Sequence, residues 1–208
     1  MDRVQLPNQT SSPNFIGAWS LSDASVCDAM IEFFNSESAQ KKVGEIGSGI
    51  QTELKKSVDI TIEPRLLKKA EYAPFTNYLK QLNECYELYK IEWPFLTGFL
   101  DTVHVGTFNV QRYLKGDHFK AVHAERMSLA NSHRLLAWMT YLNDVDGGGE
   151  TVFTHYGVSV KPRKGLTLIW PADWTHAHFG DVLEAGEKYI VTGHFHLPPV
   201  KGQLKTDK

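Results

Sequence analysis

The sequence of residues 188–197 reads KYIVTGHFHL, and the alternation of its side chains decides the fold. In an extended strand, successive side chains point to opposite faces. Tyr189, Val191 and Phe195 therefore share an apolar face, while Lys188 and His194 belong to the polar face. An apolar outer face and a polar inner face are the reverse of a filled barrel, and they predict an interior that holds a ligand. An edge strand whose polar face lies in water would show the same alternation.

Short runs of β-forming residues precede this strand, and turn-forming glycines and prolines separate them. The runs are residues 103–113, 135–142, 158–160 and 166–170, and the breaks contain Gly116, residues 147–149 and residues 162–165. Many short strands behind a helical layer favour an antiparallel barrel or jelly roll that helices support.

The first hundred residues predict two amphipathic helices and one short strand, residues 58–62. Ser22 or Asp23 can cap the first helix, and Pro74 opens the second, which ends before Pro94. The apolar stripes are Cys27, Met30, Ile31 and Phe34 in the first helix, and Phe75, Tyr78, Leu79, Leu82, Tyr86 and Tyr89 in the second.

Length and composition indicate one ordinary globular domain. The chain has 208 residues and a net charge of −2, so its charge favours neither nucleic acid nor an anionic membrane as a partner. We find no apolar run of transmembrane length and no secretory signal at the start. With only Cys27 and Cys85, the simplest compartment is a reducing cytoplasm. The oligomeric state cannot be read from the sequence.

Three histidines and one glutamate suggest a metal site. His123 and Glu125 are two residues apart, on one side of an extended chain, and His176 and His178 follow about fifty residues later with matching orientation. Two histidines and one carboxylate form the facial triad of non-haem Fe(II) oxygenases. The same set also suits catalytic zinc. An isolated His-x-Glu is more often a surface feature than a metal site.

Several short motifs accompany these residues in a fixed order. They are Tyr113-x-x-Gly116-x-x-Phe119, His123-x-Glu125, Arg134, Tyr141-Leu142-Asn143-Asp144-Val145, Gly148-Gly149-Glu150-Thr151-x-Phe153, Pro162-x-x-Gly165, His178-x-Gly180 and Gly186-x-Lys188-Tyr189. Together they resemble the 2-oxoglutarate- and Fe(II)-dependent dioxygenases, in particular the prolyl 4-hydroxylase-like branch. The resemblance covers residues 104–197, about half of the chain.

The resemblance implies an α+β, mainly β fold: a double-stranded β-helix (jelly roll) barrel supported by N-terminal helices. We expect residues 1–208 to form one domain, with 1–100 as helical support and 101–200 as the catalytic core. His123, Glu125 and His178 would be the metal ligands. His178 is preferred to His176, because Gly180 follows it and Lys188 lies ten residues further on, as in the family.

The resemblance also assigns residues to the cosubstrate. Lys188 would pair with the distal carboxylate of 2-oxoglutarate, with Tyr141 contacting the same carboxylate and Tyr113 lining its pocket. Thr192 shares the strand face of Lys188 and could add a hydroxyl contact. The two tyrosines and the threonine could instead serve only to pack the core. Lys188 could instead be a solvent-exposed lysine at the end of a strand.

Two residues depart from the family pattern. Its usual carboxylate ligand is aspartate, whereas Glu125 carries one more methylene. The strand after the cosubstrate lysine often carries tryptophan six residues on, where this chain has His194. That histidine could tune the pocket, bind product or only hydrogen-bond a neighbour.

The expected activity is an Fe(II)- and 2-oxoglutarate-dependent hydroxylation of a C–H bond, with O₂ consumed and succinate and CO₂ released. Ascorbate is a further candidate cofactor. The best guess at the substrate is a prolyl residue in a peptide or protein, and small molecules stay open. Residues 43–57 and 115–122 are predicted to be mobile loops that select it. The alternatives are a catalytically silent metal- or ligand-binding module on the same fold and a His₂Glu zinc hydrolase.

Overall fold

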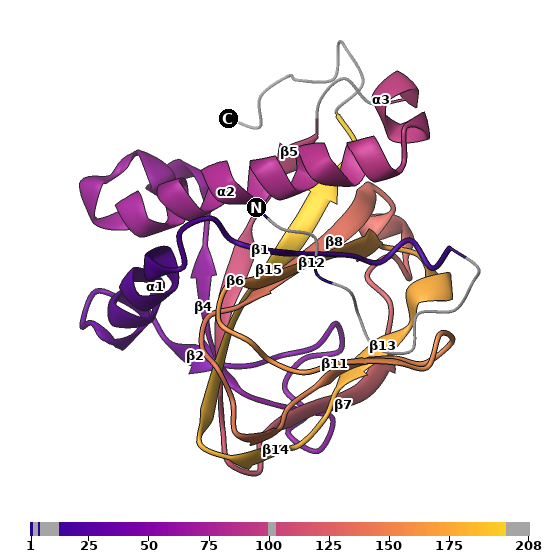
Figure 1. Cartoon of the computed structure of the whole chain (residues 1–208). Coiled ribbons are helices and arrows are strands. Elements are labelled where there is room, and N and C mark those ends of the chain that lie inside the picture. The colour runs from indigo at the N-terminus through magenta and orange to yellow at the C-terminus, as the bar shows by residue number, and fades with distance from the viewer. Residues whose placement is uncertain (2–3, 5–12, 100–102, 199–208) are drawn as a thin grey trace.

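Two antiparallel sheets face each other, and helices cover the outer side of the larger one (Figure 1). The structure is a computed structural model and describes residues 1, 4, 13–99 and 103–198. Within them the helices are α1 (Ser25–Asn35), α2 (Ala73–Glu92) and α3 (Phe95–Phe99), with 3₁₀ turns at Pro64–Lys68, Ala70–Tyr72, Leu129–Asn131 and Trp174–His176. No helix in this part of the chain is both long and apolar enough to cross a membrane.

The larger sheet has the strand order β1-β12-β8-β15-β6-β4-β2, and β5 pairs with the end of β15. Its strands are β1 (Gly17–Ser20), β2 (Lys42–Val43), β4 (Val58–Ile62), β5 (His104–Val105), β6 (Phe108–Leu114), β8 (Arg134–Tyr141), β12 (Leu166–Pro171) and β15 (Glu187–His196). The long β15 lies between β8 and β6, so its inward side chains occupy the middle of the molecule.

The smaller sheet has the order β11-β10-β13-β7-β3. Its strands are β3 (Lys55–Lys56), β7 (His118–His123), β10 (Thr151–Phe153), β11 (Val158–Val160) and β13 (His178–Gly180), and a further pair joins β9 (Gly147–Gly148) to β14 (Leu183–Ala185). The predicted mainly-β jelly roll is therefore present. Its sheets stay open along their edges and do not close into a barrel, because no described strand joins one sheet to the other.

Both predicted helices and the predicted strand at residues 58–62 form. In α1, Cys27, Met30 and Phe34 are buried. The N-cap residue is Ala24 and not the predicted Ser22 or Asp23, although the Asp23 carboxylate does accept a 2.9 Å hydrogen bond from the Ser25 amide. The aromatic stripe of α2 packs on the outer side of the larger sheet, where the Tyr78 hydroxyl lies 2.9 Å from Thr140 Oγ1. The first hundred residues are not purely helical support, since they also contribute β1 to β4.

The two faces of β15 divide as the sequence predicts. Tyr189, Val191 and Phe195 belong to the core between sheet and helices, whereas Ile190 belongs to a second core between the two sheets. Gly193 lies on the helix-facing side, where an added Cβ would come within 2.4 Å of the Trp138 ring. The polar side chains of the other face therefore point into the interior and not into solvent.

The segment at residues 115–122 is not the loop that the sequence predicts. Most of it is β7, which pairs with both β13 and β3. Its residues alternate between covered and exposed, with Phe119 inward and Lys120 outward. The lysines in this segment and Gly116, which forms the preceding turn with a φ of 87°, are typical of loops, so the sequence pattern does not predict a strand here. Residues 43–57 do form mainly irregular structure, framed by the short β2 and β3.

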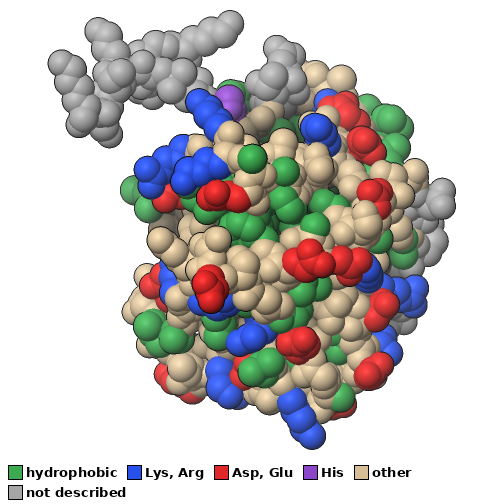
Figure 2. Space-filling view, turned by 90° about the vertical axis from the view of Figure 1, so that its left-hand side faces the viewer, with side chains coloured by type: hydrophobic (Ala, Val, Ile, Leu, Met, Phe, Trp, Pro, Cys, Tyr) green, Lys and Arg blue, Asp and Glu red, His purple; other side chains and the backbone are tan. Residues whose placement is uncertain are grey.

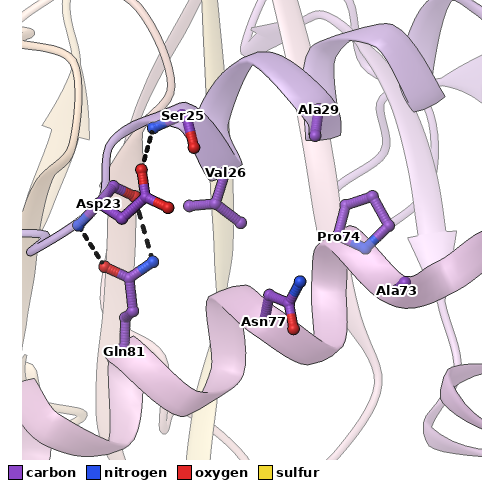
Figure 3. Close-up of a pocket in the computed structure, with 8 residues that line it drawn as sticks. All are labelled: Asp23, Ser25, Val26, Ala29, Ala73, Pro74, Asn77 and Gln81. Carbon is purple, nitrogen blue, oxygen red and sulfur yellow. Dashed lines mark hydrogen bonds between the residues drawn. The ribbon is translucent and has the colours of Figure 1, made fainter.

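Charged side chains of both signs are interspersed on the molecular face shown in Figure 2. This distribution agrees with the small net charge of −2. A hollow lies at the junction of α1 and α2, where Gln81 of α2 is bonded to the turn that precedes α1 (Figure 3). Its Oε1 accepts hydrogen bonds from the Ser22 hydroxyl and the Asp23 amide, and its Nε2 donates to the Asp23 carbonyl. These bonds satisfy the polar atoms of the Gln81 side chain, so the hollow has a structural role in holding α1 against α2.

A buried ion pair connects the smaller sheet to the larger one. Lys55 Nζ on β3 lies 2.7 Å from Asp59 Oδ2 on β4, and each side chain is less than 5% exposed. Ser57 and Gln111 donate further hydrogen bonds to the Asp59 carboxylate. The Lys55 ammonium also lies 5.3 Å from the centre of the Phe119 ring. Lys55 therefore ties β4 to β7.

We expect Lys55→Met to lower the free energy of unfolding by about 3 kcal/mol, because removing one partner leaves a buried carboxylate without its counter-charge. Urea unfolding would measure the change. Lys56→Met is the matched control: Lys56 pairs with Asp117 but is 57% exposed, so its loss should cost less than about 1 kcal/mol. Equal stabilities of the two variants would contradict a stabilising role for the buried pair.

Candidate metal centre and cosubstrate cavity

Two neighbouring strands and the loop after one of them bring the three predicted metal ligands together. His123 ends β7, His178 begins β13, and the two are direct cross-strand partners. Glu125 follows β7 by two residues, and its Oε1 lies 3.6 Å from His123 Nε2 and 3.5 Å from His178 Nε2. One donor atom from each residue falls within a 4.8 Å cluster. Two imidazoles and one carboxylate at this spacing suit a divalent transition metal.

Backbone carbonyls orient both imidazoles. His123 Nδ1 lies 2.8 Å from the Ala121 carbonyl oxygen, and His178 Nδ1 lies 2.9 Å from the His176 carbonyl oxygen. A proton on each Nδ1 would satisfy these contacts and leave each Nε2 lone pair free for a metal. The Phe119 ring stacks on His123 with centroids 4.1 Å apart, which further limits rotation of that imidazole.

The protonation states favoured by the surroundings suit metal binding. Burial, together with the neighbouring His123, lowers the pKa of His178 to about 4, so its imidazole is neutral near pH 7. Burial alone would raise the pKa of the Glu125 carboxyl. The hydrogen bond from His194 and the charges of the surrounding histidines outweigh this effect and hold that pKa well below its usual range. Metal ligands must be deprotonated, and His178 and Glu125 meet that condition.

His176 lies outside this cluster. Its Nε2 is 2.8 Å from the Asn14 carbonyl oxygen, and its Nδ1 is 3.0 Å from the Thr175 hydroxyl. Both ring nitrogens are thus used in hydrogen bonds to the chain around them. The side chain ties the N-terminal segment to the turn before β13.

The cluster faces a cavity of about 810 Å³ between the two sheets. Its buried lining includes Lys188, Tyr113 and Thr151, and its more exposed lining includes residues 45–48 and Met127. A cavity of this size exceeds what a small dicarboxylate requires, so there is space for part of a second molecule.

Lys188 lies on this cavity and is buried. Its Nζ donates a 2.7 Å hydrogen bond to the Gly149 carbonyl oxygen and lies 4.6 Å from the centre of the Tyr113 ring. No carboxylate oxygen of the described residues comes within salt-bridge distance of it. Burial lowers the pKa of Lys188 to about 8, while Glu150 and Asp181 oppose this effect from farther away.

Gly149 allows this close approach. Its φ is +76°, and a Cβ added there would lie 3.3 Å from Lys188 Nζ, so a larger residue would be strained and crowd the ammonium. The sequence singled out the Gly-Gly-Glu-Thr motif through resemblance alone. The structure supplies a physical role for its second glycine.

The other predicted cosubstrate residues differ in how they meet the cavity. Tyr113 and Thr192 both line it; their hydroxyls donate to Gln111 Oε1 and to the Trp138 carbonyl oxygen. Tyr141 lies behind the wall, with its hydroxyl 2.7 Å from the Thr151 hydroxyl, which does line the cavity.

Two residues beyond the predicted ligands contact Glu125. His194 Nε2 on β15 lies 2.7 Å from Glu125 Oε2, and the Arg134 guanidinium on β8 donates a 3.0 Å hydrogen bond to the Glu125 carbonyl oxygen. In the sequence, Arg134 belongs to the family motifs and His194 departs from the family pattern, and neither pattern assigns a partner. Only the cross-strand arrangement of β8 and β15 shows where they point.

Comparison with known proteins agrees with this geometry. Residues 108–196 match the 2OG-Fe(II) oxygenase superfamily. Human prolyl 4-hydroxylase subunit alpha-1 is 31% identical over 75 residues, which are 33% of this chain and 14% of that protein. The probable prolyl 4-hydroxylase 9 of Arabidopsis thaliana is 29% identical over 115 residues, 43% of this chain and 40% of the relative. This chain thus matches less than half the length of these curated relatives.

Solved structures share the fold over most of the chain. The viral collagen prolyl hydroxylase of Paramecium Bursaria Chlorella virus-1, in a 2OG complex, superposes with a TM-score of 0.64 at 20% identity and covers 88% of this chain and 97% of its own. A Pseudomonas putida prolyl-4-hydroxylase superposes with a TM-score of 0.66 at 17% identity, covering 89% of this chain and 94% of that protein's chain. A Trichoplax adhaerens prolyl hydroxylase in complex with a hypoxia inducible factor peptide superposes with a TM-score of 0.66 at 14% identity. This match covers 88% of this chain and 84% of that protein's chain.

The superfamily match includes His123, Glu125, His178 and Lys188, the residues that meet at the cavity. Residues 108–196 therefore belong to the 2OG-Fe(II) oxygenase superfamily, and the chain has the jelly-roll fold of the prolyl 4-hydroxylases.

Proposed function

We propose that this chain is an Fe(II)- and 2-oxoglutarate-dependent dioxygenase that hydroxylates a C–H bond of a prolyl residue in a peptide or protein. One observation carries the proposal: the buried Lys188 ammonium faces the same cavity as the His123, Glu125 and His178 cluster and has no carboxylate partner within salt-bridge distance in the described residues. A buried cation without a counter-charge is costly, and an anionic ligand would remove that cost.

The donor set fits the metal. His123 Nε2, His178 Nε2 and Glu125 Oε1 would hold Fe(II) and leave coordination positions for cosubstrate and O₂. In this family the bound metal supplies oxidation of a C–H bond, coupled to conversion of 2-oxoglutarate to succinate and CO₂. No side chain of the protein has to remove a proton from carbon in that chemistry.

The protein's own residues bind, orient and exclude water. Lys188 binds the distal carboxylate of 2-oxoglutarate, and Tyr113 packs against the ammonium through its ring. Thr192 lines the same cavity, and Tyr141 supports the Thr151 hydroxyl from behind. The Trp170 ring, buried and 5.1 Å from the His178 ring centre, shields the metal site from bulk water.

The cavity also supports a peptide as the substrate. Its lining includes the exposed apolar side chains Val122 and Met127 as well as residues 45–48. An apolar rim with polar groups further inside suits a prolyl ring flanked by ordinary peptide. The Trichoplax relative was solved with a peptide fragment, which agrees with this choice.

We further propose that residues 1–208 act as one domain, with 101–200 as the catalytic core and 1–100 as its support. Strands from the first hundred residues complete both sheets, and α1 and α2 cover the larger one. A reducing compartment such as the cytoplasm suits Cys27 and Cys85, which are free and buried.

The test is succinate release by the purified protein, with Fe(II), 2-oxoglutarate and ascorbate supplied, across a panel of proline-containing peptides. We expect one peptide class to raise succinate release at least tenfold over the peptide-free rate and to gain 16 Da in mass spectrometry. A panel without any mass gain, despite succinate release, would overturn the prolyl substrate but keep the oxygenase. Hydroxylation of the same peptides with Leu for Pro would also overturn it.

Two alternatives make different predictions. A His₂Glu zinc hydrolase gives Lys188 no role, and a silent module would bind ligands without turnover. Anaerobic titration with Fe(II) and 2-oxoglutarate separates the hydrolase from the oxygenase, because the ternary complex of the oxygenase absorbs visible light. A protein that shows this absorption but releases no succinate in air would be the silent module.

A further inference from the structure

The two oxygens of Glu125 have different surroundings. Oε1 lies within 3.6 Å of the Nε2 atoms of His123 and His178, and it is the oxygen directed at the metal position. Oε2 points the opposite way, 2.7 Å from His194 Nε2 and 3.7 Å from the Arg134 guanidinium. Glu125 and His194 are each only 16% exposed, so this contact is largely shielded from water.

The extra methylene of Glu125 makes such a partner necessary. Glutamate has one more rotatable bond than aspartate, and an unrestrained carboxylate could turn away from the metal or offer both oxygens to it. A short hydrogen bond to Oε2 fixes that torsion and reserves Oε1 for the metal. His194 provides it from β15, the strand between β8 and β6, whose position the pairing on both sides fixes.

We propose that His194 is a positioning residue that holds Glu125 as a one-oxygen metal ligand, and that Glu125 and His194 act as a matched pair. The two departures from the family pattern, a longer carboxylate and a histidine in place of tryptophan, then have one cause: the longer arm reaches both the metal and His194. An aspartate is about 1.5 Å shorter and could not reach both. The proposal rests on the metal site of the proposed function.

The test measures metal affinity, not turnover. Fe(II) or Co(II) is titrated anaerobically against a competing chelator, with the Co(II) visible spectrum as a second readout. His194→Ala should weaken binding about 10- to 100-fold, which is typical for loss of an outer hydrogen bond to a ligand. It should also change the Co(II) spectrum, because a released carboxylate alters the coordination. His194→Gln keeps an N–H donor and should recover part of the affinity.

His196→Ala is the matched control. His196 lies two residues further along the same face of β15. Its ring packs against His133, with centroids 4.5 Å apart, and lies parallel to the His194 ring at 6.2 Å, but no hydrogen bond or ion pair joins it to Glu125. It does not line the cavity. We expect this variant to bind metal within about threefold of wild type and to keep its spectrum. Thermal melting would show whether both alanine variants fold.

A double substitution distinguishes positioning from general damage. In a Glu125→Asp background the carboxylate no longer spans the gap to His194, so adding His194→Ala should change metal affinity by less than about threefold. An equal loss in both backgrounds would refute the pairing. Unchanged affinity of His194→Ala alone would also refute it. Failure of wild type itself to bind either metal would instead refute the proposed function.

Discussion

His178→Ala is expected to lose iron binding and turnover, whereas His176→Ala is expected to keep both. The two histidines are two residues apart, but only His178 directs a ring nitrogen at Glu125 Oε1, at 3.5 Å. Removing one of three protein ligands should weaken binding by more than the roughly 10- to 100-fold caused by losing an outer hydrogen bond. His123→Ala removes another ligand and should behave as His178→Ala does.

His176 reaches the metal site only through its backbone. Its carbonyl oxygen is the partner of His178 Nδ1, and this oxygen remains in His176→Ala. The variant does lose the contact to the Asn14 carbonyl oxygen, so a lower melting temperature with retained metal affinity is the expected signature. Metal content after anaerobic reconstitution and desalting would measure the difference. Iron retained by His178→Ala but lost by His176→Ala would reverse the ligand assignment.

The architecture could be predicted from the sequence because buried side chains recur at the period of the strand or helix that carries them. The alternation at residues 188–197 identified the central strand, since one face of β15 meets the helices and the other meets the cavity. The apolar stripes of α1 and α2 identified the layer above it. The same pattern did not predict the strand β7. One of its faces lines a polar cavity and the other faces solvent, so its covered positions are not consistently apolar.

The spacing of motifs predicted which residues gather at the cavity, but not how each one is bonded. Lys188 and the three clustered ligands follow from order and distance along the chain. The Tyr141 hydroxyl is directed at Thr151, and the pairing of His194 with Glu125 crosses 69 residues of sequence. No sequence pattern indicates the buried pair of Lys55 and Asp59. Such contacts depend on the packing of two sheets, which no local pattern encodes.

Lys188→Ala is expected to weaken 2-oxoglutarate binding about 30- to 3,000-fold. Deleting one partner of a desolvated charge pair costs about 2–5 kcal/mol, and about 1.4 kcal/mol corresponds to a tenfold change in affinity. Iron affinity without cosubstrate should stay within about threefold of wild type, because Lys188 does not touch the ligand cluster. Isothermal titration of the iron-loaded protein under anaerobic conditions would measure both constants.

The burial of Lys188 adds a pH dependence to this prediction. The pKa of the free protein's Lys188 is lowered to about 8, so the ammonium is charged below that pH and increasingly neutral above it. Binding of the dicarboxylate favours the charged form, which raises the pKa in the complex. Above pH 8 the site must therefore take up a proton on binding, and affinity should fall up to tenfold per pH unit. Below about pH 7 this contribution to affinity should be constant.

Lys188→Arg distinguishes the effect of the positive charge at this position from the effect of side-chain shape. An arginine stays protonated throughout this range, so the decline above pH 8 should disappear even if the affinity is lower. Some loss is expected, because Lys188 Nζ already lies 2.7 Å from the Gly149 carbonyl oxygen, which leaves little room for a planar guanidinium. If Lys188→Ala binds 2-oxoglutarate as tightly as wild type, the cavity's cation is not the cosubstrate's partner. The proposed function would then lose its main structural support, because it rests on the buried Lys188 ammonium at this cavity.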